Sequence, residues 1–110
     1  FPLTASDQLI FNRWLASEAH ARGLNIGLKN NPDQAAELVD AFDWAVLEDC
    51  YAQGWCDLLD VFIENHKAVF AIEYTDELID FDKACQMAAN KRISLILKQR
   101  SLTEFEKHCP

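Results

Sequence analysis

The sequence predicts an α/β domain built on a parallel sheet. Four apolar segments begin near residues 24, 44, 68 and 93, and a segment with helical spacing lies between each pair. Their interiors are continuously apolar rather than alternating, which is typical of strands covered on both faces. Such a run of βα units predicts four parallel strands alternating with helices, and flavodoxin-like and barrel arrangements both fit the period. No Gly-rich phosphate loop follows any strand, which disfavours nucleotide-binding versions.

The chain has 110 residues, enough for one compact domain without a linker. Ten basic residues against eighteen acidic ones give a net charge of −8. We therefore expect no nucleic-acid and no membrane partner, because a surface of that sign repels phosphate backbones and anionic lipid. The chain opens Phe1-Pro2-Leu3 without an initiator Met, and we interpret it as a processed chain or a piece of a longer one.

The first element is a helix over residues 7–22. Its apolar side chains recur at helical spacing, and Thr4 with Asp7 makes a capping-box start. Gly23 stands where the residue after a helix belongs. Residues 24–29 then read as a short strand.

Pro32 suits the first turn of a second helix that runs to about Asp40, with Asn31 as its N-cap. The later elements alternate in the same way: strand 44–48, helix 57–65, strand 68–73, helix 76–89, strand 93–98 and a last helix capped by Ser101 and Glu104.

Each of the four strands ends on a charged side chain. These ends are Lys29-Asn30, Glu48-Asp49, Glu73-Tyr74 and Lys98. A strand commonly ends on a polar residue where it meets solvent, and this alone explains any one of the four charged ends. Active sites of parallel α/β proteins lie at the carboxyl ends of the strands, so the four ends predict one patch of two carboxylates and two ammonium groups. Such a patch suits hydroxyl-rich ligands and acid–base chemistry at a glycosidic bond.

The cysteines are Cys50, Cys56, Cys85 and Cys109. Four cysteines allow three disulfide connectivities, and Cys50–Cys56 with Cys85–Cys109 requires the least crossing of the chain. The Cys85–Cys109 bond would tie the last two predicted helices together. Disulfides indicate a secreted protein, with free thiols in an intracellular α/β domain as the alternative. We expect no metal, because His66 and His108 lack the close cysteine pairs of a structural zinc site.

The aromatic side chains fall into two groups. Six are assigned to the core: Phe11, Trp14, Phe42, Trp44, Phe62 and Phe70. Tyr51 and Trp55 lie in the Cys50–Cys56 loop at the mouth of the predicted site, where they either form a platform for a sugar ring or merely close the loop. His20 is expected to face solvent.

Several segments resemble glycoside hydrolase family 114 and occur in the same order along the chain: residues 11–16, 18–24, 27–30, 47–50 and 72–74. The resemblance runs along essentially the whole chain. It implies a (β/α)8 barrel that acts outside the cell on galactose- or galactosamine-containing glycans. Residues 1–110 then form a single partial domain, the second half of a TIM barrel from helix four through strand eight and the final helix.

The resemblance also implies residue roles. Glu48 matches the family's proposed acid/base at the end of strand six, and the partner aspartate at the end of strand four falls before Phe1. Lys29, Asn30, Glu73 and Tyr74 match substrate contacts, Cys50 and Cys56 match a loop disulfide, and Lys98 and Trp55 join the predicted substrate-binding set through their positions. Where the family commonly reads Asn-Glu-Gln-Cys, this chain has Leu47-Glu48-Asp49-Cys50, and the added carboxylate of Asp49 should raise the pKa of Glu48.

The resemblance, with which the strand-end charges agree, implies a glycosidase without a cofactor that hydrolyses O-glycosyl bonds of a poly- or oligosaccharide. Half a barrel leaves sheet edges unpaired and one face uncovered, so we expect the N-terminal half, or a second copy, as a partner. The alternative is a catalytically inactive half-barrel that serves as a glycan-binding or assembly module. The changes at Leu47 and Asp49 and the missing aspartate motivate it.

Overall fold

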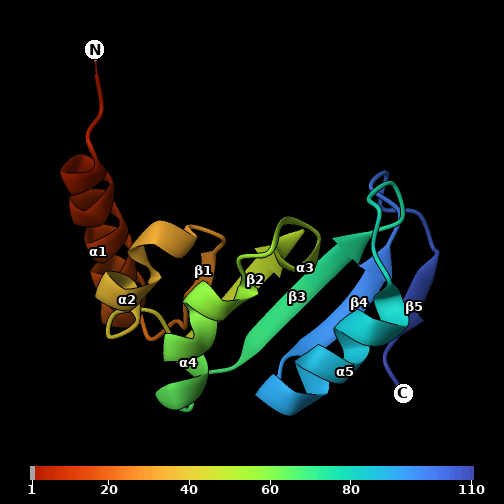
Figure 1. The fold of residues 1–110 in the computed structure, drawn as a ribbon. Helices are drawn as coiled ribbons and strands as arrows, with labels where there is room; N and C mark the ends of the chain where they lie inside the picture. Colours follow the sequence, from red (N-terminus) through yellow and green to blue (C-terminus); the bar gives the residue numbers. More distant parts are fainter. Residues whose placement is uncertain (1) are drawn as a thin grey trace.

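The computed structural model describes residues 2–110. Its strands form one five-stranded sheet in the order β1-β2-β3-β4-β5 (Figure 1). Four strands are parallel neighbours, which confirms the predicted α/β class: β1 Gly27–Lys29, β2 Trp44–Glu48, β3 Val69–Tyr74 and β4 Ser94–Lys98. The fifth, β5 Glu106–His108, pairs antiparallel with β4. All four parallel strands end at the same edge, the upper edge in Figure 1.

Helices connect the strands. They are α1 Ala5–Ala21, α2 Ala35–Leu38 after the 3-10 turn η1 Pro32–Gln34, α3 Cys50–Gln53, α4 Asp60–Glu64 after the 3-10 turn η2 Cys56–Leu59, and α5 Phe81–Lys91. Helices α4 and α5 lie on the same face of the sheet (Figure 1). No helix within residues 2–110 is long and apolar enough to cross a membrane.

The two faces of the sheet differ in burial. Residues that alternate along β2 and β3, such as Leu47 and Ala71, are buried beneath the helices. Their neighbours on the other side stay partly exposed, and Phe70 keeps 44% of its surface. We call this second side the open face; its apolar members are Trp44, Val46, Phe70, Ile72 and Ile96. The continuously apolar strands predicted that both faces of the sheet are covered. Among the described residues, helices cover one face only.

The start of the chain agrees with the capping prediction. The Thr4 hydroxyl accepts the N–H of Asp7 at 3.1 Å, and the Asp7 carboxylate accepts the N–H of Thr4 at 2.8 Å. Gly23 has φ +71°, a left-handed conformation that costs glycine little. Asn31 occupies the predicted N-cap position, directly before Pro32 in η1. Its side chain caps no backbone N–H, because its backbone is left-handed and its side-chain amide donates to Gln34.

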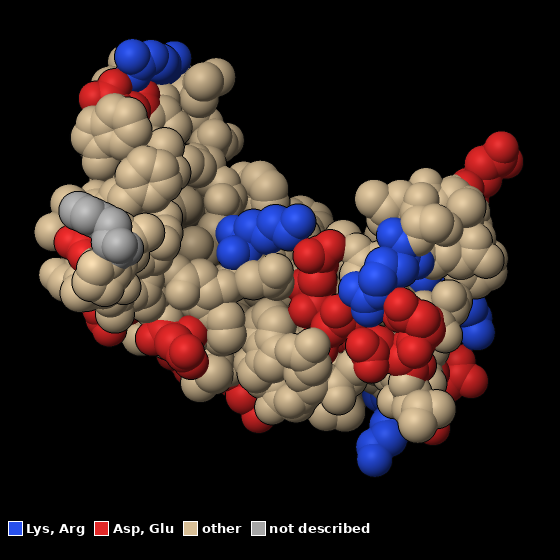
Figure 2. Space-filling view, turned by 90° about the horizontal axis from the view of Figure 1, so that it is seen from above, with Lys and Arg blue, Asp and Glu red and all other residues tan. Residues whose placement is uncertain are grey.

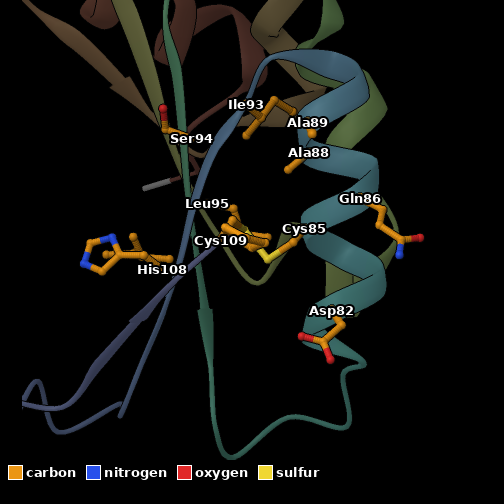
Figure 3. A pocket seen from close by; sticks show the side chains of 12 residues that line it. Asp82, Cys85, Gln86, Ala88, Ala89, Ile93, Ser94, Leu95, His108 and Cys109 are labelled. Carbon is orange, nitrogen blue, oxygen red and sulfur yellow. A yellow bond between two sulfur atoms is a disulfide. The ribbon is translucent and has the colours of Figure 1, made fainter.

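The prediction of a last helix from Ser101 is also wrong. Residues 106–108 instead pair with the edge of β4, which would otherwise leave its backbone groups unpaired. The disulfide between Cys85 on α5 and Cys109 holds this segment in place (Figure 3). It therefore joins a helix to the end of a strand rather than two helices. Helix α5 also starts later than predicted, with Asp80 as its N-cap.

Part of the predicted aromatic core is wrong for this chain. Phe42 and Phe62 are buried, whereas Phe11 and Trp14 on α1 and Phe70 on β3 are exposed. The exposed rings lie on surfaces that no other described element covers. His20 does more than face solvent, because its Nε2 lies 2.8 Å from Oδ2 of Asp43 and so ties α1 to the segment before β2.

Candidate active site at the carboxyl ends of the strands

Glu48, the last residue of β2, presents its carboxylate at the carboxyl edge of the sheet. The hydroxyl of Tyr74 on β3 donates a 2.5 Å hydrogen bond to its Oε1, and the Lys29 ammonium on β1 lies 3.4 Å from its Oε2. Seen from above in Figure 2, acidic and basic side chains lie beside one another along the middle of this edge. The structure thus brings together three of the predicted site residues, each from a different strand.

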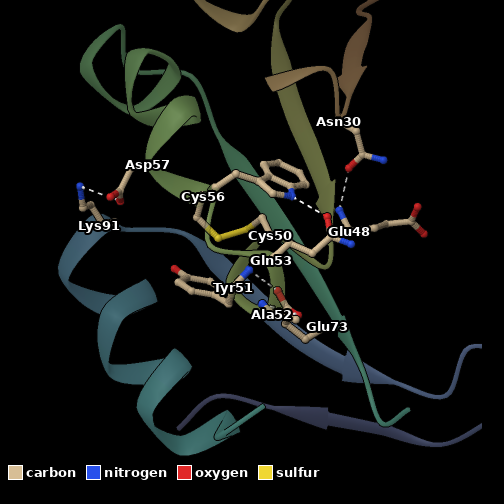
Figure 4. Close-up of a disulfide and its surroundings, with 11 residues drawn as sticks. Asn30, Glu48, Cys50, Tyr51, Ala52, Gln53, Cys56, Asp57, Glu73 and Lys91 are labelled. Atoms are coloured by element: carbon tan, nitrogen blue, oxygen red, sulfur yellow. Dashed lines mark hydrogen bonds and ion pairs between the residues drawn. A yellow bond between two sulfur atoms is a disulfide. The ribbon is translucent and has the colours of Figure 1, made fainter. Parts of the chain in front are cut away.

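Asn30 holds the backbone of Glu48. Its φ of +55° turns the chain directly after β1, and its Oδ1 accepts the N–H of Glu48 at 2.8 Å (Figure 4). Asparagine tolerates this left-handed conformation better than most residues. The amide oxygen of Asn30 is therefore engaged in positioning the candidate acid/base.

The pKa of Glu48 lies below its ordinary value. The Tyr74 hydrogen bond is the main cause, the positive charge of Lys29 adds to it, and partial burial opposes both. The predicted rise in pKa from the neighbouring Asp49 is therefore wrong. Asp49 adopts a left-handed backbone (φ +62°), and its carboxylate pairs with Arg100.

Arg100 joins the segments that follow three strands. Its guanidinium donates to both oxygens of Asp49 at 3.1 Å and to both oxygens of Asp76 at 2.7 and 2.9 Å. The same group lies 4.1 Å from the ring centroid of Tyr74, a cation–π contact. Arg100 and Asp76 were not predicted as site residues, although they follow the predicted strands 93–98 and 68–73 by two and three residues. A window extended three residues past each strand would have included them.

Tyr74 is 3% exposed, so its ring is fixed beneath the edge of the site. Burial, together with the hydrogen bond to Glu48, raises its pKa to about 12. The phenol consequently remains protonated and acts as a hydrogen-bond donor to Glu48 across the neutral pH range.

Glu73 does not join this cluster. Its side chain points to the helix-covered face and is fully buried, and its Oε1 accepts the N–H of Tyr51 at 2.6 Å. The second oxygen accepts the N–H of Ala52 at 3.3 Å (Figure 4). Burial raises the pKa of Glu73, and the two N–H donors oppose that rise. Its position gives it a structural contact with α3 rather than access to a ligand.

The Cys50–Cys56 loop carries the two aromatic residues predicted near the site. Trp55 is partly buried against the core and donates from Nε1 to Gln53 at 2.9 Å, so its indole closes the loop. Tyr51 also packs against the core, and its hydroxyl is buried with no partner among the described residues. This geometry favours loop closure over a sugar platform for both rings.

Lys98 lies beside Tyr74 in the register of β3 and β4. Its ammonium donates to the carbonyl of Thr103 at 2.9 Å and so holds the segment between β4 and β5. Lys98 is thus next to the cluster, but it pairs with the backbone rather than with Glu48.

All four cysteines are paired as predicted, Cys50 with Cys56 and Cys85 with Cys109. The two sulfurs of Cys50 and Cys56 lie within 4.8 Å of a carboxylate oxygen of Glu73. Their disulfide leaves no thiolate to hold a metal ion there.

A cavity of about 540 Å³ lies away from Glu48, between α5, β4 and the last three residues (Figure 3). Its lining is mostly apolar and includes the Cys85–Cys109 disulfide, Ile93 and Leu95. None of the strand-end side chains described above lines it. The candidate site is therefore identified by its chemistry and not by the size of a cavity.

Comparison with known proteins adds a family to this geometry. The model of glycoside-hydrolase family GH114 matches residues 1–110. The crystal structure of Aspergillus fumigatus Ega3 in complex with galactosamine is 33% identical to this chain and superposes with a TM-score of 0.85. The match covers 97% of this chain and 47% of Ega3, so the chain spans about half the length of that structure. The chain has no significant match among curated proteins.

Proposed function

From its membership of glycoside-hydrolase family GH114, we propose that this chain is the second half of a secreted glycosidase. The enzyme would cleave O-glycosyl bonds in galactose- or galactosamine-containing glycans. The observation that carries the proposal is the carboxylate of Glu48 at the carboxyl edge of the sheet, held between Tyr74 and Lys29. Residues 1–110 would form one partial barrel domain, in which β5 replaces the expected final helix.

Glu48 is proposed as the general acid/base. In this chain its lowered pKa favours the ionised form, which is the form that accepts a proton. Glycosidases of this kind use two carboxylates, and we propose that the second one is an aspartate at the end of strand four of the complete barrel, outside this chain. A second negative charge close to Glu48 would raise its pKa and allow it to donate a proton as well.

Lys29, Asn30, Tyr74 and Lys98 remain proposed substrate contacts, whereas Trp55 leaves this set because its indole closes the Cys50–Cys56 loop. Lys29 is the best placed, because its side chain is largely exposed beside Glu48. Glu73 is withdrawn from this set, because it has no exposed surface and both of its oxygens bond to the backbone of α3.

Two structural features support the rest of the proposal. The open face of the sheet exposes Phe70, which suits burial against the other half of a barrel or a second copy. The two disulfides suit an extracellular enzyme.

The test is Glu48→Gln in the complete protein, assayed on a galactosamine polymer. Gln keeps the size of the side chain but can neither take up nor release the proton, so turnover should fall by about 10²–10⁴-fold. The matched control is Glu64→Gln, an exposed glutamate at the end of α4, away from this edge. Unchanged turnover in the Glu48→Gln enzyme, with the fold intact, would remove Glu48 from the reaction.

A second candidate is a glycan-binding or assembly module without catalysis. The favouring observation is that Glu48 already has a hydrogen-bond donor and an ammonium as partners, as a purely structural carboxylate would. This function predicts that the complete protein binds the polymer, releases no sugar, and retains binding after Glu48→Gln. Release of reducing ends by the complete protein would exclude it.

A further inference from the structure

We propose that Arg100 is a positioning residue of the candidate active site. It holds the Tyr74 ring so that the Tyr74 hydroxyl stays on Glu48. The inference rests on the proposed role of Glu48, and it adds a residue whose hydrogen bonds go to Asp49 and Asp76 and not to Glu48.

The first step is the connection between segments. Asp49 follows β2, Asp76 follows β3, and Arg100 follows β4, so one guanidinium ties together the three segments beyond neighbouring strands. Each carboxylate receives two hydrogen bonds, and this needs the planar fork of arginine. A lysine at this position keeps the charge but cannot reproduce that geometry.

The second step is the contact with Tyr74. The guanidinium lies over the Tyr74 ring at 4.1 Å, and the hydroxyl of that ring donates to Glu48 at 2.5 Å. Since the ring is almost fully buried, its orientation is determined by what packs on it. Arg100 therefore acts on Glu48 indirectly, because it holds the Tyr74 hydroxyl, an uncharged hydrogen-bond donor, in position.

The third step concerns the backbone next to Glu48. Asp49 adopts a left-handed conformation, which non-glycine residues rarely take without support. Its N–H donates to Ile72 at 3.0 Å, and its carboxylate is fixed by Arg100. Arg100 therefore also holds the residue that directly follows the candidate acid/base.

Charge alone does not explain the arrangement. The ionisable groups around Glu48 are Lys29 from β1, Asp49 from its own segment, Tyr74 from β3, and Lys98 and Arg100 from β4 and beyond. Arg100 is surrounded by the carboxylates of Asp49, Asp76 and Glu77. These carboxylates compensate most of the positive charge of Arg100, so its electrostatic effect on Glu48 is small. Substitution of Arg100 by lysine would therefore act mainly through the lost hydrogen-bond geometry.

The test is an NMR titration of the Glu48 carboxyl carbon in the 110-residue chain, assigned by its loss in Glu48→Gln. The variants are Arg100→Lys, Tyr74→Phe and the two combined, with Arg22→Lys as the control. Arg22 forms a surface pair with Glu18 on α1. Amide spectra identify the variants that keep the fold.

Tyr74→Phe removes the hydrogen bond and should move the Glu48 midpoint upward by about one pH unit. Arg100→Lys should move it in the same direction by less, and should add almost nothing when Tyr74 is already Phe. If Arg100→Lys is indistinguishable from Arg22→Lys, or if its effect persists in full without the Tyr74 hydroxyl, the positioning role is wrong.

Should Arg100→Lys lose the fold, Asp76→Asn removes only the half-exposed partner of Arg100 and should shift Glu48 in the same direction. No shift in that variant would equally overturn the proposal. The titration does not depend on catalysis. A complete protein that hydrolyses normally with Glu48→Gln would refute the proposed function, while the measured coupling between Arg100 and Glu48 would stand or fall by itself.

Discussion

Glu73 accepts the backbone N–H of Tyr51 at 2.6 Å from a position with no exposed surface. The two residues are 22 positions apart, on β3 and on α3. This contact, with its partner at Ala52, attaches the disulfide loop to the centre of the sheet. Glu73 was predicted from the sequence as a site residue, because it ends a strand. The contact shows that its side chain lies on the helix-covered face of the sheet instead.

Replacing Glu73 with Gln should lower the free energy of unfolding by about 2 kcal/mol at acid pH. The Gln carbonyl can accept one N–H, but its amide faces the other donor, which is left unpaired. Chemical denaturation measures the change, and Glu64→Gln, at an exposed position on α4, is the control. Equal stability of Glu73→Gln and wild type would show that the two hydrogen bonds contribute nothing.

The cost of Glu73→Gln should also depend on pH. Burial raises the pKa of Glu73 above its ordinary value of 4.5, so the folded chain holds this proton more tightly than the unfolded chain does. Wild-type stability therefore falls as pH rises from about 4.5 through the raised pKa. The Gln variant lacks this loss, so the difference between the two proteins should shrink as the pH rises. A difference that grows instead would contradict the raised pKa.

Removing the disulfides should have unequal effects. Cys50–Cys56 spans 6 residues and Cys85–Cys109 spans 24. Loop-closure entropy then predicts losses of about 2 kcal/mol for the Cys50→Ser, Cys56→Ser pair and about 3.5 kcal/mol for the Cys85→Ser, Cys109→Ser pair. Denaturation of the two double variants measures both. A larger loss for the smaller loop would show that packing around Cys50, rather than chain entropy, dominates.

Gly27 should not tolerate alanine. An added Cβ would lie 2.5–2.6 Å from the indole atoms of Trp44 on the neighbouring strand. We expect Gly27→Ala to cost about 2–3 kcal/mol, because the ring must leave its place in the sheet. In a Trp44→Leu background the same change should cost much less, and a double-mutant cycle measures the difference. Additive costs would contradict the close approach of these two residues.

The open face should make the 110-residue chain self-associate. Phe70 is 44% exposed there and packs edge-on against Trp44 at 5.9 Å between ring centroids. Sedimentation velocity at rising concentration should show dimers or larger species, and Phe70→Gln should shift them toward monomer. Met87→Gln, an exposed apolar residue on α5, is the control. A monomer at every concentration would argue against burial of this face by a partner.

Local sequence signals determined much of the fold. The βα period predicted the four parallel strands, with the ends of β2 at the predicted residues. The capping box of α1 followed from a short-range pattern, and both disulfide pairs followed from the order of the cysteines along the chain. These features depend on residues close in the chain or on simple spacing, which is why the sequence alone was enough.

The last strand was missed because its stability does not come from its own residues. Glu106–His108 carries no β pattern and all three residues are exposed, so its strand form depends on the free edge of β4 and on the Cys85–Cys109 bond. The Ser101 and Glu104 pattern indicated a helix cap, but no helix in this structure follows it.

The candidate site divides in the same way. The sequence by itself determined that Glu48 stands at a strand end and that charged residues accompany it. Only the tertiary structure decided that Glu48 pairs with Tyr74 and Lys29, that Asp49 turns to Arg100, and that Glu73 lies beneath α3. Adjacent residues of a strand point to opposite faces, and side-chain partners come from other strands. The pKa of Glu48 therefore depends on contacts across the sheet, not on its neighbour in the chain.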